Sequence, residues 1–353
     1  MKLVPEYVEI GGRRVGPGYP AFVIAEAGVN HNGSLDLARQ LIDAAVRAKA
    51  DAVKFQTFIT EESISRAAPQ AAYQRENTGK SESMFDMVKR LELPLEAFAE
   101  LSDYCKARDM IFLSSPFDVQ SVDVLDRLNV PALKIASGEI TNLPFLAYVA
   151  TKRRPIILST GMSNLAEVES ALRAIEQAGN PPVILLHCVS NYPAAASDIN
   201  LRAMATMARE FAVPVGYSDH TSGLEVALAA VALGACVIEK HFTLDRNMPG
   251  PDHKASLEPD ELRKMVQGIR TVESALGHGR KEPAASEMDT VRVTRKSLVA
   301  ARDIRQGEEL TLESIAIKRP GTGLPPAMRD EVIGRKARHE ISEGTPITIE
   351  VLE

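Results

Sequence analysis

Short apolar runs alternate with amphipathic segments through most of the chain. Eight of these runs have the length and the β-branched or aliphatic character of buried strands, and each precedes a segment with apolar residues at helical spacing. Eight strand–helix units in succession predict an α/β protein that folds as a (β/α)₈ barrel, or TIM barrel. An open doubly wound sheet is the alternative, but no G-x-G-x-x-G sequence follows the first run. The predicted strands cover residues 21–27, 52–58, 110–115, 132–137, 155–159, 183–189, 215–217 and 236–242.

Two of the predicted helices have candidate capping residues. Ser34 precedes a helix expected over residues 35–49, and its hydroxyl can accept from a backbone N–H of the first turn. Thr221 or Ser222 is the expected cap of a small-residue helix over 221–233.

One connection is too long and too polar for a tight turn between a strand and a helix, namely residues 60–93. Loops of this length in compact domains are usually functional or mobile. We predict either a substrate-covering loop that carries Tyr73, Gln74 and Asn77 or a plain surface insertion.

The pattern changes after residue 276. Residues 277–293 contain a Gly-, Pro- and charge-rich stretch that indicates a linker, and residues 294–353 have short alternating or β-branched pieces separated by turn residues. We therefore expect a catalytic barrel over 1–276, a linker, and a small β-rich domain over 294–353 that needs a neighbouring surface for its stability.

Composition and charge exclude several classes of protein. A net charge of −6 and the absence of Trp give no support for a nucleic-acid surface. Cys105, Cys188 and Cys236 are widely spaced in apolar patterns, which predicts reduced core residues. The N-terminus has no basic segment before an apolar core, and the longest apolar run, 226–238, is too short to span a bilayer. We expect a cytoplasmic protein with no membrane partner.

Two histidines stand at the carboxyl ends of the last two predicted strands, where parallel α/β proteins bind their ligands. His220 and His241 can share one divalent cation, with Asp219, Glu239, Asp252 or water as oxygen ligands. Two histidines are too few for a closed structural zinc site, which favours an open catalytic site. The alternative is that each histidine only forms a hydrogen bond near its strand end.

The other strand ends carry lysines, hydroxyls and carboxylates. Two lysines with several Ser and Thr hydroxyls and a nearby cation suit a substrate with a phosphate and a carboxylate. Acidic residues on the same rim can position a second, neutral, polyhydroxylated substrate. Each lysine taken alone is better explained as a solvated rim charge, whereas the set together favours a phosphorylated or carboxylated small substrate. The polar residues include Glu26, Lys54, Gln56, Ser115, Lys134, Ser137, Glu139, Ser159, Ser190, Tyr192 and Ser218.

Several stretches resemble one known family, the sialic acid synthases, including relatives that make legionaminic acid and spore-coat sugars. In the predicted barrel these stretches are IAEAGVNHNGS, VKFQTF, SSPFD, LKIASGE, ILSTGM, LHCVSNYPA, GYSDHT, IEKHFTLDR and PGPDHKAS. Near the C-terminus, RKSLVAARDIRQGE and KRPGTGLPP resemble the family's antifreeze-like (SAF, β-clip) module. The resemblance covers nearly all of the chain in order.

The resemblance implies an enzyme that condenses phosphoenolpyruvate with an N-acylated mannosamine-type sugar to a nine-carbon 2-keto acid, releasing phosphate. His220 and His241 would bind the metal, with Mn²⁺ expected first and Mg²⁺ or Co²⁺ as alternatives. Glu26 or Asp252 would transfer protons. Phosphoenolpyruvate would contact Lys54, Lys134, Ser137, Ser159 and Ser218, with Ser115 and Ser190 nearby. The sugar would contact Glu26, Gln56, Glu139, Tyr192 and Asp252.

The resemblance also implies a homodimer in which Arg319 of the small domain reaches the partner's sugar site. Ser190 departs from the sialic acid branch, which often has Asn there, so the sugar itself stays open between N-acetylmannosamine and 2,4-diacetamido-2,4,6-trideoxymannose. A different barrel enzyme that joins phosphoenolpyruvate to an aldose phosphate would need basic residues for a second phosphate. A non-catalytic sugar- or ice-binding protein would be expected to lack the metal ligands or the lysines.

Overall fold

A computed structural model describes residues 7–71, 74–75 and 82–353. The chain divides into two compact units, Met1–Gly277 and His278–Glu353. Each unit has its own apolar core, and each is described by itself below. In the described part of the chain, no helix is both long and apolar enough to cross a membrane.

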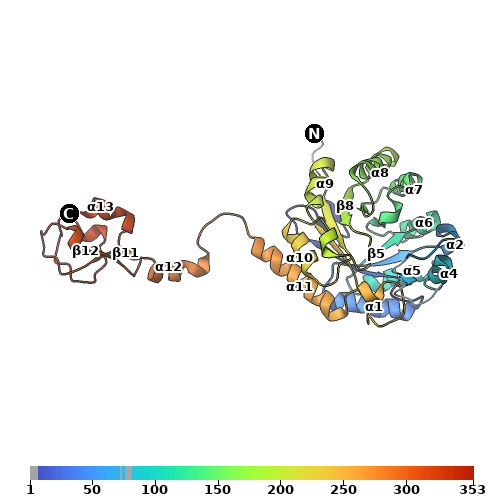
Figure 1. The fold of residues 1–353 in the computed structure, drawn as a ribbon, viewed down its shortest axis with the longest axis horizontal. Helices are drawn as coiled ribbons and strands as arrows, with labels where there is room; N and C mark the ends of the chain where they lie inside the picture. The colour runs from blue at the N-terminus through green and yellow to red at the C-terminus, as the bar shows by residue number, and fades with distance from the viewer. Residues whose placement is uncertain (1–6, 72–73, 76–81) are drawn as a thin grey trace. The chain divides into compact units, whose positions relative to one another are not determined.

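The first unit is a nearly closed barrel of eight parallel strands, as predicted (Figure 1). The hydrogen-bonded order is β5-β4-β3-β10-β9-β8-β7-β6, so the last strand of the barrel pairs with the first. β5 and β6, at the two ends of this order, also lie next to each other. The strands are β3 (Phe22–Gly28), β4 (Ala52–Thr57), β5 (Ile111–Pro116), β6 (Leu133–Ile135), β7 (Ile156–Ser159), β8 (Val183–Cys188), β9 (Val215–Asp219) and β10 (Val237–His241).

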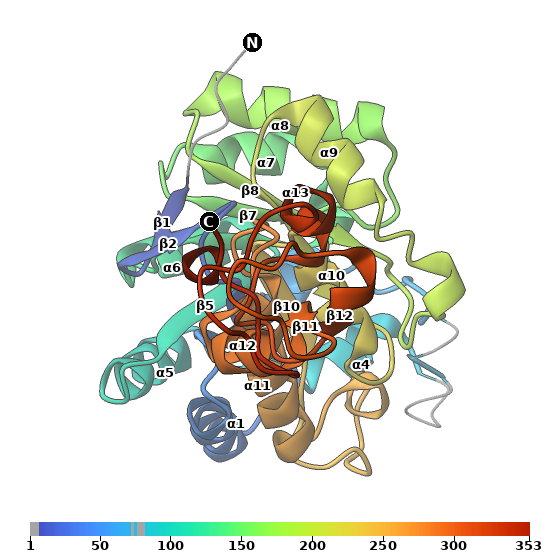
Figure 2. The same cartoon turned by 90° about the vertical axis from the view of Figure 1, so that its left-hand side faces the viewer.

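Helices surround the barrel and cover the outward-facing apolar residues of its strands. The first helix starts after Ser34, whose hydroxyl accepts from the N–H of Leu37 as predicted. α7 and α8 pack side by side on the outside of the barrel (Figures 1 and 2). The helices are α1 (Leu35–Ala48), α2 (Thr60–Ser63), α4 (Met84–Lys89), α5 (Ala97–Lys106), α6 (Val119–Arg127), α7 (Leu143–Ala150), α8 (Leu165–Ala178), α9 (Ala203–Phe211), α10 (Glu225–Ala232) and α11 (Pro259–Leu276).

A short hairpin closes the N-terminal end of the barrel, and the sequence analysis did not predict it. Its strands β1 (Val8–Ile10) and β2 (Arg13–Val15) pair in antiparallel fashion across Gly11 and Gly12, both of which have positive φ. Its apolar side chains pack with the first residues of the barrel strands, including Phe22. The barrel is therefore filled at this end, and its functional cavity lies at the carboxyl ends of the strands.

The prediction that Thr221 or Ser222 caps the helix α10 is wrong. The helix begins at Glu225, not Thr221, and neither Thr221 nor Ser222 caps it. The Thr221 N–H and hydroxyl both donate to the Asp219 carboxylate, and Gly223 has φ +79°, so the backbone turns before the helix can begin.

The second unit is a small β domain with few regular strands. β11 (Ser297–Ala300) pairs in antiparallel fashion with β12 (Ile315–Lys318). Residues nearer the C-terminus contribute isolated bridges, such as that of Ile341 with Ile304. A helix, α12 (Met288–Thr294), overlaps the end of the stretch expected to be a linker, residues 277–293. The unit's core includes Leu298, Leu310 and Ile347.

Candidate active site

A cavity of about 550 Å³ opens at the carboxyl ends of the barrel strands. It brings together twelve of the side chains that the resemblance assigns to the substrates or the metal, and they come from all eight strands or the turns that follow them. The pleat explains the selection, because alternate residues of a strand face the barrel interior. The twelve are Glu26, Lys54, Gln56, Ser115, Lys134, Ser137, Ser159, Ser190, Tyr192, Ser218, His220 and His241.

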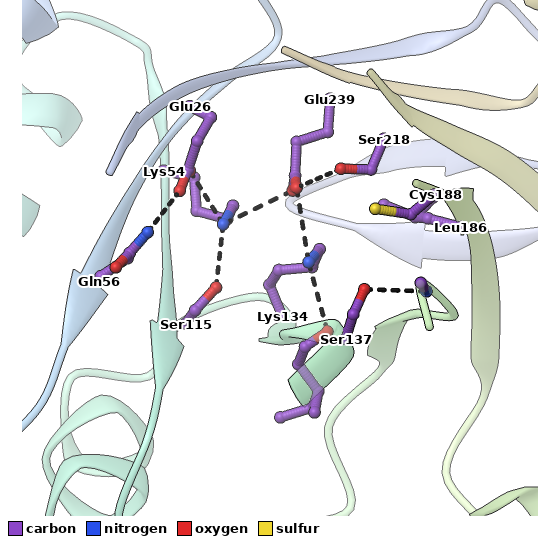
Figure 3. A network of polar contacts seen from close by, with 12 residues as sticks. Glu26, Lys54, Gln56, Ser115, Lys134, Ser137, Leu186, Cys188, Ser218 and Glu239 are labelled. Atoms are coloured by element: carbon purple, nitrogen blue, oxygen red, sulfur yellow. Dashed lines mark hydrogen bonds and ion pairs between the residues drawn. The ribbon is translucent and has the colours of Figure 1, made fainter. Parts of the chain in front are cut away.

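Two lysines and two carboxylates form a buried cluster in this cavity (Figure 3). Lys54 Nζ lies 2.9 Å from Glu26 Oε2 and 3.6 Å from Glu239 Oε2. Lys134 Nζ lies 3.5 Å from Glu239 Oε1. All four side chains are at most 5% exposed. The two positive charges therefore share the Glu239 carboxylate, while Glu26 pairs with Lys54 alone.

The cluster shifts the pKa values of its two carboxyl groups in opposite directions. Burial raises the pKa of Glu26 to about 7, although the ammonium of Lys54 opposes this. Burial acts on Glu239 in the same sense, but Lys134 and Lys54 together lower its pKa to about 2. Burial also lowers the pKa of Lys134. The cluster therefore favours the ionised form of Glu239, whereas Glu26 is the carboxyl group that holds a proton more readily.

Sequence reasoning missed this role of Glu239, which was considered only as a metal ligand. A signal was present, since His241 was expected to face the ligand and residue 239 lies two positions earlier on the same strand. The same alternation turns Lys240 and Asp219 away from the cavity. On the far side of their strands, Lys240 Nζ lies 2.7 Å from Asp219 Oδ2. Both side chains are fully buried.

Hydroxyl groups surround the two lysines. The Lys54 ammonium donates to Ser115 Oγ at 2.9 Å, and Ser218 Oγ donates to Glu239 Oε1 at 3.0 Å. Ser137 Oγ accepts from the Gly161 N–H. Ser159 Oγ is buried and has no hydrogen-bond partner in the described part of the chain. These hydroxyls and the two ammonium groups give the cavity the donors that a phosphate and a carboxylate require.

The two candidate metal-binding imidazoles face each other, with ring centroids 5.4 Å apart. His220 Nδ1 lies 2.7 Å from the Val189 carbonyl oxygen. A hydrogen bond to a carbonyl requires Nδ1 to carry the proton, so Nε2 is the nitrogen that could bind a metal when the ring is neutral. Burial opposes the charged form of His220, but Cys188 and the Val189 carbonyl raise its pKa above the ordinary value. Within the described residues, the buried Nδ1 of His241 has no hydrogen-bond partner. Burial, followed by the nearby charge of His220, lowers the pKa of His241 well below its ordinary value, which keeps this ring neutral.

The expected carboxylate ligands do not join the histidines. The Asp219 carboxylate accepts hydrogen bonds from Lys240 and Thr221. The Glu239 carboxylate forms ion pairs with Lys54 and Lys134 and accepts a hydrogen bond from Ser218. In residues 7–71, 74–75 and 82–353, no group of three His, Cys, Asp or Glu side chains is arranged to hold a metal ion. A cation bound by the two imidazoles would therefore need water or substrate oxygens for its remaining positions.

A second cavity of about 320 Å³ adjoins the first and shares Gln56, Tyr192 and His241 with it. Two predicted carboxylates, Glu139 and Asp252, line this second cavity and not the first. Burial raises the pKa of Asp252 to about 6.

The long polar connection contributes to both cavities. Gln74 is 7% exposed and lines both of them, and Gln70 is 4% exposed and lines the first. This position agrees with the substrate-covering alternative. Tyr73 and Asn77 lie outside the described residues. Arg319 is exposed in the second unit, before a cis peptide bond to Pro320, so its proposed place at a partner's site stays a prediction.

Comparison with known proteins agrees with the resemblance noted from the sequence. Residues 41–281 match the NeuB family, and residues 295–353 match the SAF domain. The chain is 45% identical over 342 residues to the N,N'-diacetyllegionaminic acid synthase of Legionella pneumophila, covering 96% of each chain. It is 49% identical to the Campylobacter jejuni enzyme of the same name, covering 91% of this chain and 97% of that one.

Solved structures give the same result. The N-acetylneuraminic acid synthetase of Leptospira borgpetersenii, crystallised with citrate, superposes with a TM-score of 0.72 at 37% identity, covering 82% of this chain and 97% of that one. The family match spans more than half of the chain, and the relatives align over nearly all of it. The chain belongs to the NeuB family, with a C-terminal SAF domain, and is a neuraminic or legionaminic acid synthase-like enzyme.

Proposed function

We propose that the protein condenses phosphoenolpyruvate with an N-acylated mannosamine-type sugar, forming a nine-carbon 2-keto acid and inorganic phosphate. The observation that carries this proposal is the pair of buried lysines beside unpaired or exchangeable hydroxyls, in a cavity that adjoins a second, differently lined cavity. Such a pair of cavities suits one anionic and one neutral substrate that must meet.

Phosphoenolpyruvate would occupy the first cavity. Its phosphate and carboxylate require several donors, and Lys54 and Lys134 supply two buried ammonium groups. The remaining contacts would come from hydroxyls on the same strand ends. These are Ser115, Ser137, Ser159, Ser190 and Ser218.

The sugar would occupy the second cavity, with its aldehyde carbon at the junction of the two. Gln56, Tyr192 and His241 line both cavities and therefore mark this junction. Glu139 and Asp252 would accept hydrogen bonds from the sugar's hydroxyl and amide groups.

A divalent cation fits the two imidazoles at the junction. Among the described residues the buried Nδ1 of His241 has no hydrogen-bond partner, and the bond between His220 Nδ1 and Val189 makes Nε2 the nitrogen of His220 that would bind a metal. The family resemblance implies Mn²⁺, with Mg²⁺ or Co²⁺ as alternatives, and oxygen atoms of water or substrate would fill the positions that the two imidazoles leave open. When bound, the cation would polarise the carbonyl of the open-chain sugar.

The reaction then requires one carbon–carbon bond and three proton transfers. Carbon 3 of phosphoenolpyruvate attacks the aldehyde carbon, and the aldehyde oxygen takes up a proton. Water adds to the electron-poor carbon 2 and loses a proton, which leaves a hydroxyl and the phosphate on that carbon. The hydroxyl then loses its proton as the bond between carbon 2 and the bridging oxygen breaks, so the keto group forms and phosphate leaves with the bridging oxygen and a proton. Glu26 and Asp252, with pKa values raised to about 7 and about 6, can donate or accept protons near neutral pH. Lys54 and Lys134 stabilise the phosphate throughout.

The test is phosphate release from phosphoenolpyruvate with Mn²⁺, measured together with product mass. Phosphate release that requires both phosphoenolpyruvate and an N-acylated mannosamine-type sugar, with a nine-carbon 2-keto acid as product, is the expected result. Release of phosphate without any sugar, or failure to form a carbon–carbon bond with any such sugar, would overturn the proposal.

We also propose that the active enzyme is a homodimer in which Arg319 contacts the sugar bound to the partner. Mixing an Arg319→Ala chain with a Lys134→Met chain tests this, because a mixed dimer would hold one site with both side chains intact. Recovery of activity on mixing is expected. Two inactive variants that stay inactive together, under conditions where the chains exchange, would contradict the shared site.

A further inference from the structure

We infer that His253 is a positioning residue for the carboxyl group of Asp252, and that it acts by tying the segment after β10 to the turn after β3. The inference rests on the proposed function, in which Asp252 contacts the sugar, and it adds a residue to which the resemblance gives no role. His253 itself lines neither the first nor the second cavity. Its effect on the reaction therefore passes through the residue that precedes it.

The segment that carries Asp252 has little regular structure of its own. Asp252 is 8% exposed, lines the second cavity and lies in the connection from β10 to α11. The residues directly after it form a single 3₁₀ turn, His253–Ala255. One such turn contributes few hydrogen bonds, and their geometry is poorer than in an α-helix. The position of the Asp252 carboxyl group therefore depends on contacts that this segment makes with the rest of the barrel.

The imidazole of His253 supplies two of these contacts. The residue is completely buried, with Nδ1 2.7 Å from Thr243 Oγ1 and Nε2 3.2 Å from Asn32 Oδ1. A neutral ring satisfies both groups, since Nε2–H donates to Asn32 and Nδ1 accepts from the Thr243 hydroxyl. Burial lowers the pKa of His253 to about 4, which agrees with a neutral ring near pH 7. The ring thus joins the end of β10 to the turn after β3.

A second chain of hydrogen bonds leads from the same turn to Asp252. Asn30 Nδ2 donates to Ser256 Oγ at 3.0 Å, and the Ser256 hydroxyl donates to the backbone carbonyl oxygen of Asp252 at 2.7 Å. Asn30 and Ser256 are both 1% exposed, so water does not compete strongly for these bonds. The turn after β3 therefore holds the segment of Asp252 at two points, one through Ser256 and one through His253.

Close packing also fixes the His253 ring. Gly250 lies directly against it, so that a Cβ at this position would be 2.6 Å from His253 Cδ2 and 3.0 Å from Asn32 Oδ1. Such distances are too short for carbon in contact with either atom, and a larger residue would push the ring away from Asn32. Pro251 and Asp252, which lie between this glycine and the histidine, both line the second cavity. A displaced ring should therefore displace the wall of that cavity.

Replacing His253 with alanine removes both hydrogen bonds and leaves a space beside Asp252. A misplacement of about 1 Å in a group that contacts the substrate can cost about 100-fold in rate, so we expect kcat/KM for the sugar to fall by roughly 100-fold. The KM for phosphoenolpyruvate should stay within about twofold of its original value, because the lysines and hydroxyls of the first cavity do not depend on this segment.

Two conservative variants separate the two hydrogen bonds. Glutamine places its amide near the position of Nε2, and asparagine places its amide near that of Nδ1. His253→Gln should keep the bond to Asn32 and recover at least about tenfold of the lost kcat/KM. His253→Asn keeps the bond to Thr243, which lies in the same connection as His253, and should stay near the level of the alanine variant.

The partner residue offers an independent variant. Asn32 has a φ of 51°, which glycine adopts without strain, so Asn32→Gly removes the acceptor and leaves the backbone conformation accessible. Alone, it should lower kcat/KM for the sugar by about tenfold or more. In a His253→Ala background it should have little further effect, because the bond that it removes is already absent.

The assay measures kcat and KM for both substrates with Mn²⁺, using N-acetylmannosamine or 2,4-diacetamido-2,4,6-trideoxymannose, whichever the unaltered protein converts faster. His187→Gln is the matched control. His187 Nε2 lies 2.6 Å from the Ile199 carbonyl oxygen, and the residue lines neither the first nor the second cavity. This variant should leave kcat/KM for the sugar within about threefold of the original value.

Several results would overturn the role of His253. One is a His253→Ala or Asn32→Gly enzyme, folded by circular dichroism, with unchanged kcat/KM for the sugar. Another is an equal rise in the KM of both substrates, which would indicate general damage to the barrel. A His253→Gln enzyme no better than His253→Asn, or a comparable loss with His187→Gln, would also contradict it. Failure of the unaltered protein to join phosphoenolpyruvate to any N-acylated mannosamine would instead overturn the proposed function, and this inference with it.

Discussion

Replacing Glu239 with glutamine would leave Lys54 and Lys134 buried without their shared carboxylate. The substitution preserves the size of the side chain, and its amide oxygen can still accept from Ser218 Oγ, which donates to Glu239 Oε1 at 3.0 Å. What is lost is the negative charge 3.6 Å from Lys54 Nζ and 3.5 Å from Lys134 Nζ. The variant therefore isolates the electrostatic part of the interaction.

The expected loss of stability can be worked out in two ways. The lysines lower the pKa of Glu239 from 4.5 to about 2 despite burial, and about 1.4 kcal/mol for each tenfold change in proton affinity gives about 3 kcal/mol. Removing one partner of a buried ion pair costs about 3–5 kcal/mol in general. We expect the free energy of unfolding to fall by about 3–5 kcal/mol at pH 6.

The loss in free energy of unfolding caused by Glu239→Gln should be smaller at high pH. Burial already lowers the pKa of Lys134, and removal of the carboxylate would lower it further. A base with a depressed pKa in the folded state makes the unfolded chain bind more protons, so stability rises with pH until the lysine is neutral in both states. The difference between variant and unaltered protein should therefore be smaller at pH 9 than at pH 6.

The assay is urea denaturation followed by far-ultraviolet circular dichroism, with and without inorganic phosphate. Phosphate should stabilise Glu239→Gln more than the unaltered protein, because it replaces the missing negative charge. Glu210→Gln, at an exposed position on α9, is the control and should change stability by less than about 0.5 kcal/mol. A loss below about 1 kcal/mol for Glu239→Gln, without any added effect of phosphate, would refute the reasoning.

Three further predictions follow from the same site and barrel. His220→Ala should abolish Mn²⁺-dependent turnover, and isothermal titration should show weakened Mn²⁺ binding; near-normal values in both would remove His220 from the metal site. The pKa of Glu26 is raised to about 7 in the folded protein, whereas the unfolded chain releases this proton above about pH 4.5. Between these two pH values the folded state binds more protons, so the contribution of Glu26 to the free energy of unfolding is lost as pH rises from 4.5 to 7. Glu26→Gln should flatten that part of the stability–pH curve, measured by urea denaturation with chelator present, and an unchanged slope would contradict the assignment. Gly216→Ala would place a Cβ 2.5 Å from the Val237 carbonyl oxygen inside the barrel, so thermal unfolding should show a loss of at least about 1–3 kcal/mol; a variant as stable as the unaltered protein would contradict this close packing.

The barrel was predictable because its strands are continuous apolar runs, whereas its helices have apolar residues at helical spacing. Lys54 and Gln56 are two positions apart in one strand, so alternation directs both to the same side, and both line the first cavity. The hairpin at the N-terminal end was missed because each of its strands has only three residues. Gly11 and Gly12 between two short alternating segments were the available signal, since a Gly-Gly pair favours the tight turn of a hairpin.

Other features depend on contacts that no local pattern contains. The start of α10 moves to Glu225 because Thr221 bonds to Asp219, and that carboxylate is held by Lys240 from the neighbouring strand. The separation of Glu139 and Asp252 into a second cavity likewise depends on how segments distant in sequence meet. The start of α10 and the position of the second cavity both depend on strand order and side-chain direction. Neither can be predicted from the composition or residue spacing of a single segment.

The four buried side chains of the central cluster, two lysines and two glutamates, would be electrically neutral as a group if all were ionised. An anion with more than one negative charge that enters this cavity disturbs that balance, and Glu26 is the member poised to restore it, because its pKa lies at about 7. Binding of such an anion should therefore draw a proton from solution. In a calorimeter, the heat of binding would then change with the ionisation enthalpy of the buffer, and the slope would count the protons taken up.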